Sequence, residues 1–291
     1  MLGLLRRRLR IGIGGMMLAI LLFGLWLGNW VNRAREQRIA VAAIKADNGF
    51  VLYADEFNMG PVKIPAGNAI WKPSWGTLIP KKGPTKPSLS QRWLGDEYVR
   101  EVAHVSLFVD IEKGSAGAPN NLPRPLDDVL ATLRSQSGIK TLHLGGDTVT
   151  DKGLASVAEL TDLRELVIWW ATNITDAGVA HLSLLPKLRM VNISLSSLTD
   201  EGVRHLSTLP ALDDLNLQGK KFTDQSLLHL SRAKDLKSII LRMDKSEISD
   251  EGLKHLEGLS NLRCLHLQKS KFSNEAKERL LKAIPGLEIV P

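Results

Sequence analysis

Four histidines recur at one equivalent position of a repeating sequence, each six residues after a Thr or Ser. Imidazole is a frequent zinc ligand, so a column of histidines suggests a metal site. Zinc, however, requires ligands that converge tetrahedrally, whereas equivalent positions on successive parallel helices form a row whose side chains diverge. We therefore predict no metal site for these residues, which are His181, His205, His229 and His255.

The sequence contains no arrangement that is typical of a catalytic centre. It lacks H-E-x-x-H, G-x-S-x-G, the phosphate-binding G-x-x-x-x-G-K-[ST] loop and any pair of cysteines. Its one cysteine, Cys264, forms no internal disulfide, and no His and acid can be placed beside it from the sequence. We therefore predict that the chain is not an enzyme and needs no cofactor, and that Cys264 is an ordinary residue of a strand face.

Two phrases alternate along the second half of the chain and define the repeat. The first has apolar residues at offsets 0, 3 and 5 and returns six times at a spacing of 24 to 26 residues. The second begins with Thr or Ser, which Asp usually follows. The first phrase starts at Ile139, Leu163, Leu188, Leu212, Leu236 and Leu262, and the second at Thr150, Thr175, Thr199, Thr223, Ser249 and Ser273. Such a period indicates a solenoid, a class of protein that mostly binds partners.

Each phrase predicts one element of secondary structure. The residues at offsets 3 and 5, such as Leu166 and Ile168, lie on one face of a short strand. In the second phrase the hydroxyl residue caps a helix, and the acid lies at the positive end of its dipole, as for Thr175 and Asp176. Because every repeat re-enters in the same direction, we expect parallel strands on a concave face and helices on a convex face.

These phrases resemble the leucine-rich-repeat family, and most closely its T-D-x-G-L subclass of about 24–26 residues per repeat. The resemblance covers residues 139–291 and implies a right-handed α/β solenoid. One departure concerns the Asn or Cys ladder that many members place after the strand. This chain has one Cys in total and no regular Asn at that place, so that ladder is not expected.

The concave face is the candidate site for a protein or peptide ligand. Side chains at offsets 2, 4 and 6 of each first phrase point out of that face. The central rows combine a Trp with amides and an Arg, a composition that is enriched at binding hot spots. The alternative is an ordinary solvated strand surface, and the sequence leaves both open. The candidate residues are Trp169, Met190, Asn192, Asn216, Gln218 and Arg242.

The basic charge of the chain does not indicate nucleic-acid binding. The net charge is +7, but residues 1–38 hold seven Arg and one Glu. Residues 139–291 hold 20 Lys or Arg and 20 Asp or Glu, so the repeats are neutral overall. Nucleic-acid binding would require a basic stripe on the folded surface. We therefore predict no nucleic-acid partner.

Residues 11–32 carry no charge and are long enough to cross a bilayer as a helix. Trp26 and Trp30 suit the membrane interface, and no small-x-small cleavage site precedes the arginines. We therefore predict an uncleaved signal anchor rather than a cleaved signal peptide. Arginines before the segment favour an extracytoplasmic solenoid, but Arg33, Arg35 and Arg38 follow it, so the cytoplasmic orientation stays open.

The chain divides into five predicted parts. A membrane anchor occupies 1–32, a juxtamembrane helix and strand 33–58, a Pro/Lys-rich linker 59–90, a small α+β cap or degenerate repeat 91–138, and the solenoid 139–291. In the cap, Val102, Val105 and Leu107 repeat the offsets of the first phrase, and a helix is predicted over 126–137. An irregular first unit of this kind covers the apolar end of a solenoid.

The whole layout is similar to membrane-anchored leucine-rich-repeat proteins that are abundant in planctomycete bacteria. The similarity rests on the anchor, the A-V-x-x-I…G-x-V-x-Y stretch of 40–53, the W-L-G-D-E-Y-V unit from Trp93 and the repeats. It implies a fold and an anchor but no catalytic residue. We predict an interaction or scaffolding module at the membrane. The alternative is a self-associating structural component of the cell envelope, which makes homo-oligomers.

Overall fold

The computed structural model describes residues 13–46, 50–53, 57–60, 77–80, 102–107, 125–134, 136–145, 147–268 and 271–290. Of the predicted linker 59–90, only 59–60 and 77–80 fall within these ranges. Residues 1–12 of the predicted anchor and 91–101 of the predicted cap also lie outside them.

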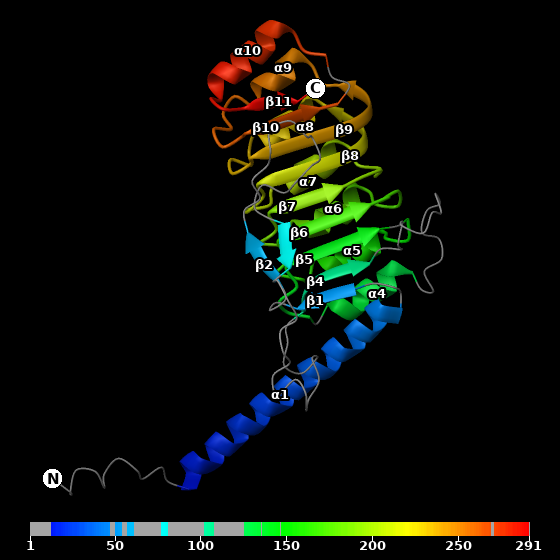
Figure 1. Cartoon of the computed structure of the whole chain (residues 1–291), viewed down its shortest axis with the longest axis vertical. Helices are drawn as coiled ribbons and strands as arrows, with labels where there is room; N and C mark the ends of the chain where they lie inside the picture. The colour runs from blue at the N-terminus through cyan, green and yellow to red at the C-terminus, as the bar shows by residue number, and fades with distance from the viewer. Residues whose placement is uncertain are drawn as a thin grey trace, which may run out of the picture.

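One nine-stranded sheet runs along the solenoid in the order β1-β4-β5-β6-β7-β8-β9-β10-β11 (Figure 1). All neighbouring strands are parallel except β1 and β4, which are antiparallel. The strands are β1 (Phe50–Tyr53), β4 (Val102–Leu107), β5 (Thr141–Gly145), β6 (Glu165–Trp169), β7 (Met190–Ile193), β8 (Asp214–Thr223), β9 (Ser238–Glu247), β10 (Cys264–Leu267) and β11 (Glu288–Val290). The predicted parallel sheet is therefore confirmed.

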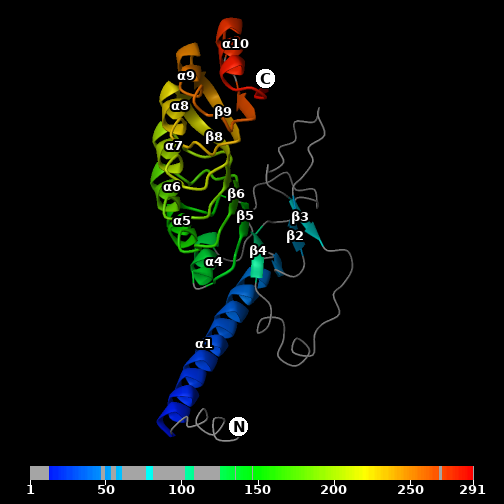
Figure 2. The ribbon, with the colours of Figure 1, turned by 90° about the vertical axis from the view of Figure 1, so that its left-hand side faces the viewer.

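Short helices form a second layer against one face of this sheet (Figure 2). They are α4 (Leu126–Leu133), α5 (Asp151–Val157), α6 (Asp176–Leu182), α7 (Asp200–Leu206), α8 (Asp224–Leu230), α9 (Asp250–Lys254) and α10 (Asn274–Ala283). The core lies between the two layers, where the three apolar residues of one first phrase, Leu163, Leu166 and Ile168, are all 0% exposed. This arrangement confirms an α/β solenoid with one strand and one helix in each repeat.

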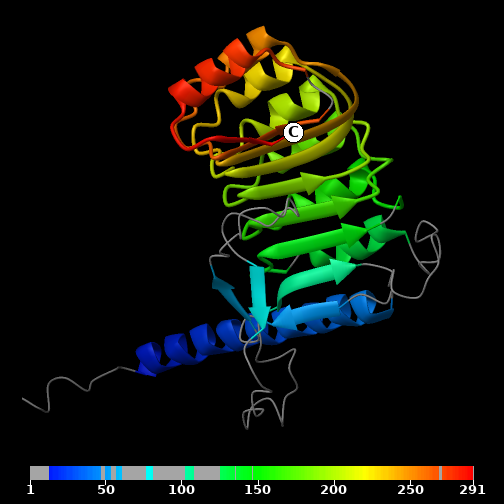
Figure 3. The ribbon, with the colours of Figure 1, turned by 45° about the horizontal axis from the view of Figure 1, so that its top comes forward.

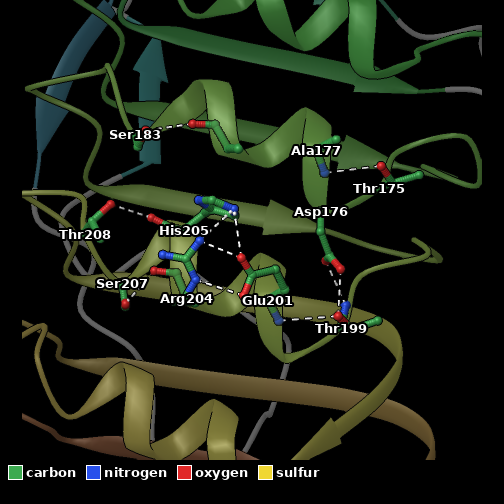
Figure 4. Close-up of polar contacts among 11 residues, drawn as sticks. Thr175, Asp176, Ala177, Ser183, Thr199, Glu201, Arg204, His205, Ser207 and Thr208 are labelled. Carbon is green, nitrogen blue, oxygen red and sulfur yellow. Dashed lines mark hydrogen bonds and ion pairs between the residues drawn. The ribbon is translucent and has the colours of Figure 1, made fainter.

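The residue before each repeat helix caps it. The hydroxyl of Thr199 accepts a hydrogen bond from the backbone N–H of Glu201 at 3.3 Å, and Thr175 accepts one from Ala177 in the same way (Figure 4). Thr150, Thr223, Ser249 and Ser273 cap their helices similarly. These caps satisfy backbone donors that have no partner within the helix.

The aspartate after each cap binds the next repeat. The carboxylate of Asp176 accepts two hydrogen bonds from Thr199, one from its backbone N–H at 3.0 Å and one from its hydroxyl at 2.6 Å (Figure 4). Thr150 donates to Asp127 of α4 in the same way, so α4 extends this series of hydrogen-bonded Asp–Thr pairs to the unit before the first full repeat. The same pairing joins Asp151 to Thr175, Asp200 to Thr223 and Asp224 to Ser249. The sequence suggested only a helix-dipole role for these acids.

Helix α1 (Ile13–Ala46) is one unbroken helix with two different surroundings. Its N-terminal part exposes large apolar side chains, such as Phe23 and Trp26, each 60% exposed. Its last turns lie against the first strands of the solenoid (Figure 3) and contact α4 and β1. There Val41 and Ile44 are buried in the core. The predicted boundary at 32/33, between the anchor and a juxtamembrane helix, does not interrupt it, because residues 32–38 contain no Pro or Gly. The helix thus covers the first layer of the solenoid.

Among the described residues, one helix is long and apolar enough to cross a membrane. It is the part of α1 from Met17 to Ala46, whose best window has a mean hydropathy of 1.2 and is 6% buried. This finding rests on length and composition.

A second, two-stranded sheet pairs β2 (Phe57–Gly60) with β3 (Thr77–Pro80) in antiparallel register. Figures 1 and 2 show it beside the large sheet, on the face that the helices leave open. This sheet therefore stands on the same side as the candidate binding residues.

Candidate interaction surface

The parallel register aligns side chains of the open face into rows that cross the strands. The first row contains His104, Thr141, Glu165, Met190, Asp214, Ser238 and Cys264. The second contains Ser106, His143, Val167, Asn192, Asn216, Ile240 and His266. The third lies at the strand ends and contains Trp169, beside Gly145, and the paired residues Gln218 and Arg242.

The six candidate residues all belong to these rows but differ in accessibility. Met190 is 0% exposed, Asn192 6% and Asn216 3%, so these three side chains are not available for a first contact with a partner. Strand alternation assigns a side chain to a face but does not report how much of that face the neighbouring rows cover, which is why the sequence grouped all six together.

The accessible candidates all lie in the third row. Trp169 is 36% exposed, and Gln218 and Arg242 are half-buried. We call these three residues the strand-end row. Arg242 donates a hydrogen bond from Nη1 to Oδ1 of Asn216 at 3.0 Å, so the buried amide of the second row orients the guanidinium of the third. The row presents an indole, an amide and a cation along one margin of the open face.

A polar cluster lies beside Trp169 at the N-terminal end of the sheet. The imidazole of His143 is hydrogen-bonded through Nε2 to Oε1 of Glu165 at 2.9 Å, and its ring centroid is 6.2 Å from that of Trp169. His104 lies 4.8 Å from His143, ring to ring, and is hydrogen-bonded to the Thr141 hydroxyl. Burial, reinforced by His143, lowers the pKa of His104 to about 3. The His104 imidazole is therefore neutral at physiological pH.

Sequence reasoning missed this cluster, although a signal for it was present. His104 occupies offset 2 of the predicted degenerate unit, the same offset as Thr141 in the first full repeat. Extending the reading of the open face to that unit would have placed His104 in the first row. The interpretation stopped at the regular repeats.

The titratable side chains at the C-terminal end of the open face, Cys264 and His266, do not indicate a catalytic site. Burial raises the pKa of the Cys264 thiol, and the negative charges of Glu288 and Asp214 act in the same direction. The thiol therefore stays protonated at neutral pH, which does not favour a nucleophilic role. Burial, followed by the positive charge of Arg242, lowers the pKa of His266. Of the three residues of the strand-end row, Arg242 is the charged one.

The histidine column lies on the helix layer. His205 is 3.4 Å from Glu201, measured from Nε2 to Oε1, and Arg204 binds the same carboxylate (Figure 4). Within the described part of the chain, no group of three or more His, Cys, Asp or Glu side chains could hold a metal ion. The contacts of His205 are those of a surface residue paired along its own helix.

Comparison with known proteins gives structural similarity alone. No protein-family model matches the chain, and no curated protein matches it either. Similar solved structures include an internalin C2 from Listeria monocytogenes, with a TM-score of 0.45, 25% identity and coverage of 55% of this chain and 65% of that chain. Another is a leucine-rich-repeat protein from Leptospira interrogans, with a TM-score of 0.38, 21% identity and coverage of 55% and 45%.

A third similar structure is the plant peptide hormone receptor RGFR1 in complex with RGF2, with a TM-score of 0.36, 13% identity and coverage of 55% of this chain and 25% of that chain. The match spans less than two thirds of each of these three proteins. The repeat architecture is shown by the regular series of strands, helices and Asp–Thr or Asp–Ser hydrogen bonds described above.

Proposed function

We propose that this chain is a membrane-anchored module that binds a protein or peptide through the strand-end row, Trp169, Gln218 and Arg242. The observation that carries the proposal is that, over the central strands β6 to β9, the first two rows of the open face are buried whereas the strand-end row is accessible. Trp and Arg are the residues most enriched at binding hot spots, and an amide between them adds directional hydrogen bonding. A short extended segment that crosses the strand ends would meet all three side chains.

In this proposal the chain has no catalytic role. An indole, a primary amide and a guanidinium bind ligands well, but none of them is a nucleophile or a general base at neutral pH. The neutral thiol of Cys264 and the neutral imidazole of His104 fit the same interpretation.

The proposed anchor is the apolar part of α1, and the solenoid is proposed to lie outside the cytoplasm. The exposed apolar side chains of α1, such as Phe23 and Trp26, support an anchor because water would not solvate them favourably. A C-terminal fusion to a reporter that is active only outside the cytoplasm tests the orientation. Activity supports the proposed side, and an intact but silent fusion reverses it.

The binding test selects peptides from a random 12-residue display library with the full chain held in lipid nanodiscs. We expect selected peptides to lose at least tenfold in affinity for a Trp169→Ala/Arg242→Ala variant. The matched control is Lys152→Ala/Leu281→Ala, which also removes one cation and one large apolar side chain, but from exposed sites of α5 and α10. Equal binding by all three proteins would remove the strand-end row from the proposal.

Self-association is the alternative function, and β11 is the feature that favours it. This strand forms the C-terminal edge of the sheet within the described strands, so its outer backbone groups could pair with another chain. Sedimentation of the full chain over a hundredfold range of concentration separates the two functions. Reversible oligomers would favour self-association, and a monomer that binds selected peptides would favour the interaction module.

A further inference from the structure

One edge of the solenoid is basic, and it is formed where each helix leads into the next strand. We call it the strand-start edge. The six connections that form it contain nine Lys or Arg and five Asp or Glu. They are residues 134–140, 158–164, 183–189, 207–213, 231–237 and 255–263. The excess is local, because the repeats as a whole hold 20 residues of each sign.

Much of this positive charge faces solvent. Arg164, Arg232, Lys234 and Arg263 are exposed, and none of them forms an ion pair with another described residue. Although Glu159, the partner of Arg134, is 54% exposed, other pairs at this edge use acids that lie inward of the cations. For example, Asp213 is 4% exposed and binds both Arg189, which is 38% exposed, and Lys237, which is 43% exposed. Six of the nine cations of this edge are exposed, against two of its five acids, so a large anionic surface would meet mainly positive charge.

An apolar side chain projects among these cations. Leu184 is 69% exposed, the largest exposed fraction among the large apolar side chains of the described residues. It lies two residues after the end of α6 and three residues before Lys187. Exposed leucine between basic side chains is the composition of surfaces that rest on lipid headgroups, where the apolar group enters the interface and the cations bind phosphate.

The direction of α1 places this edge toward a bilayer. In Figures 1 and 3 the strands begin on the side of the sheet to which the N-terminal part of α1 extends. A helix of 34 residues is about 50 Å long, and a bilayer core takes about 30 Å of it. The remaining turns pack on α4 and β1. With the apolar part of α1 in a bilayer, as proposed above, the strand-start edge would be the side of the solenoid that is turned toward the headgroups.

We propose that the strand-start edge docks on the anionic headgroup surface of the bilayer that holds α1. The inference rests on the proposed anchor and is independent of the strand-end row. Attraction between Lys or Arg and anionic lipid acts within about one Debye length, roughly 8–10 Å at physiological salt. Docking therefore depends on the lipid composition and on salt, whereas insertion of α1 depends on neither.

The test measures energy transfer to an acceptor on lipid headgroups, with the full chain reconstituted in vesicles. A fluorophore is attached through Leu184→Cys at the strand-start edge or through Thr172→Cys. Thr172 is exposed and lies in the connection from β6 to α6, at the opposite edge of the same repeat. Both carry Cys264→Ser so that the label has one target. Vesicles contain phosphatidylcholine alone or with 30% phosphatidylglycerol, and flotation at alkaline pH reports anchoring.

In vesicles with phosphatidylglycerol, we expect transfer from the Leu184→Cys label to exceed that from the Thr172→Cys label by at least twofold. The difference should disappear in 0.5 M salt and in an Arg164→Glu/Lys234→Glu variant. It should persist in the control Lys152→Glu/Lys282→Glu, which makes the same change in charge on exposed residues of α5 and α10.

Two results would overturn the inference at different points. Equal transfer from both labels in vesicles that still float with the protein would reject docking and leave the anchor intact. Failure of the chain to float would reject the anchor and, with it, docking. Neither result bears on peptide binding by the strand-end row, which the display experiment measures separately.

Discussion

The carboxylate of Asp176 occupies the space in which a side chain at Gly202 would begin. A Cβ built on Gly202 would lie 2.5 Å from Oδ1 of Asp176 and 3.0 Å from Cδ2 of Leu198. Gly153, Gly178 and Gly252 have the same relationship to Asp127, Asp151 and Asp224. The glycine of the T-D-x-G phrase is therefore explained by the aspartate of the preceding repeat, which reaches across to bond the cap beside it.

Gly202→Ala should destabilise the solenoid by about 1–3 kcal/mol, because the added methyl must displace a hydrogen-bonded carboxylate. Denaturant unfolding of the full chain in detergent micelles measures the change. Gly258→Ala is the matched control, since its nearest heavy atom is the flexible Nζ of Lys234 at 3.4 Å. Gly202→Ser should cost less, because Ser226 at the equivalent position of the next repeat donates its hydroxyl to Asp200. Equal stability of the Gly202 and Gly258 variants would contradict this account.

Asp176→Ala should lower the free energy of unfolding by about 1 kcal/mol, because Thr199 loses the acceptor of two hydrogen bonds. The stronger test is the double variant Asp176→Ala/Gly202→Ala. Removal of the carboxylate also removes the obstacle to the new methyl, so the two costs should be strongly sub-additive. Asp235→Ala, which removes an exposed acid elsewhere on the solenoid, serves as the control. Additive costs would show that the two residues act independently.

Stability should fall with acidification below about pH 6.5, because His104 takes up a proton only after unfolding. Its folded pKa, about 3, lies below the unfolded value of about 6.5. The unfolded state therefore binds the extra proton, and stability decreases by up to about 1.4 kcal/mol per pH unit as the pH falls from 6.5 toward 3. Above pH 6.5 this contribution is fully present.

Denaturant unfolding at pH 7, 6 and 5 measures the slope, in a range that avoids most carboxylate titration. His104→Gln should reduce the slope of the unfolding free energy against pH by the equivalent of nearly one bound proton. His181→Gln, a change at an exposed helix position, should leave this slope unaltered. An unchanged slope in the His104 variant would show that another group carries the dependence. Since burial also lowers the pKa of His266, some slope should remain.

Ile44→Ala should destabilise the N-terminal end of the solenoid by about 2–5 kcal/mol, because Ile44 is 1% exposed within the core. Hydrogen exchange of the full chain should show faster exchange in α4 and β4 and little change in α10, since repeats contact mainly their neighbours. Ile39→Ala is the control on the same helix, where the side chain is 55% exposed. Uniform acceleration along the whole solenoid would contradict a local capping role.

The repeat elements could be predicted because their signals are local and recur. The apolar offsets that place Leu166 and Ile168 in the core and the hydroxyl that caps α6 each depend on a few adjacent residues. The bond from Thr199 to Asp176 spans 23 residues, and the sequence shows only that both types recur. The unbroken course of α1 could have been read from residues 32–38, which contain strong helix formers and no breaker.

The candidate site was predicted less completely. Alternation along β6 and β8 assigned Trp169 and Gln218 to the open face. It did not separate them from Met190 and Asn192, whose burial depends on neighbouring strands and on the shape of the face. The basic strand-start edge was also missed. The charges of residues 139–291 sum to zero, but they are distributed unequally over the two edges of the solenoid.

The proposed anchor role of α1, together with its packing on the solenoid, would give proteolytic release two distinct products. A cut near residue 32 would free a solenoid that keeps residues 33–46, so Val41 and Ile44 would still cover its first layer. A cut after residue 46 would remove that cover and leave apolar surface of α4 facing water. The first product would be a shed and folded domain, and the second would be a target for aggregation or degradation.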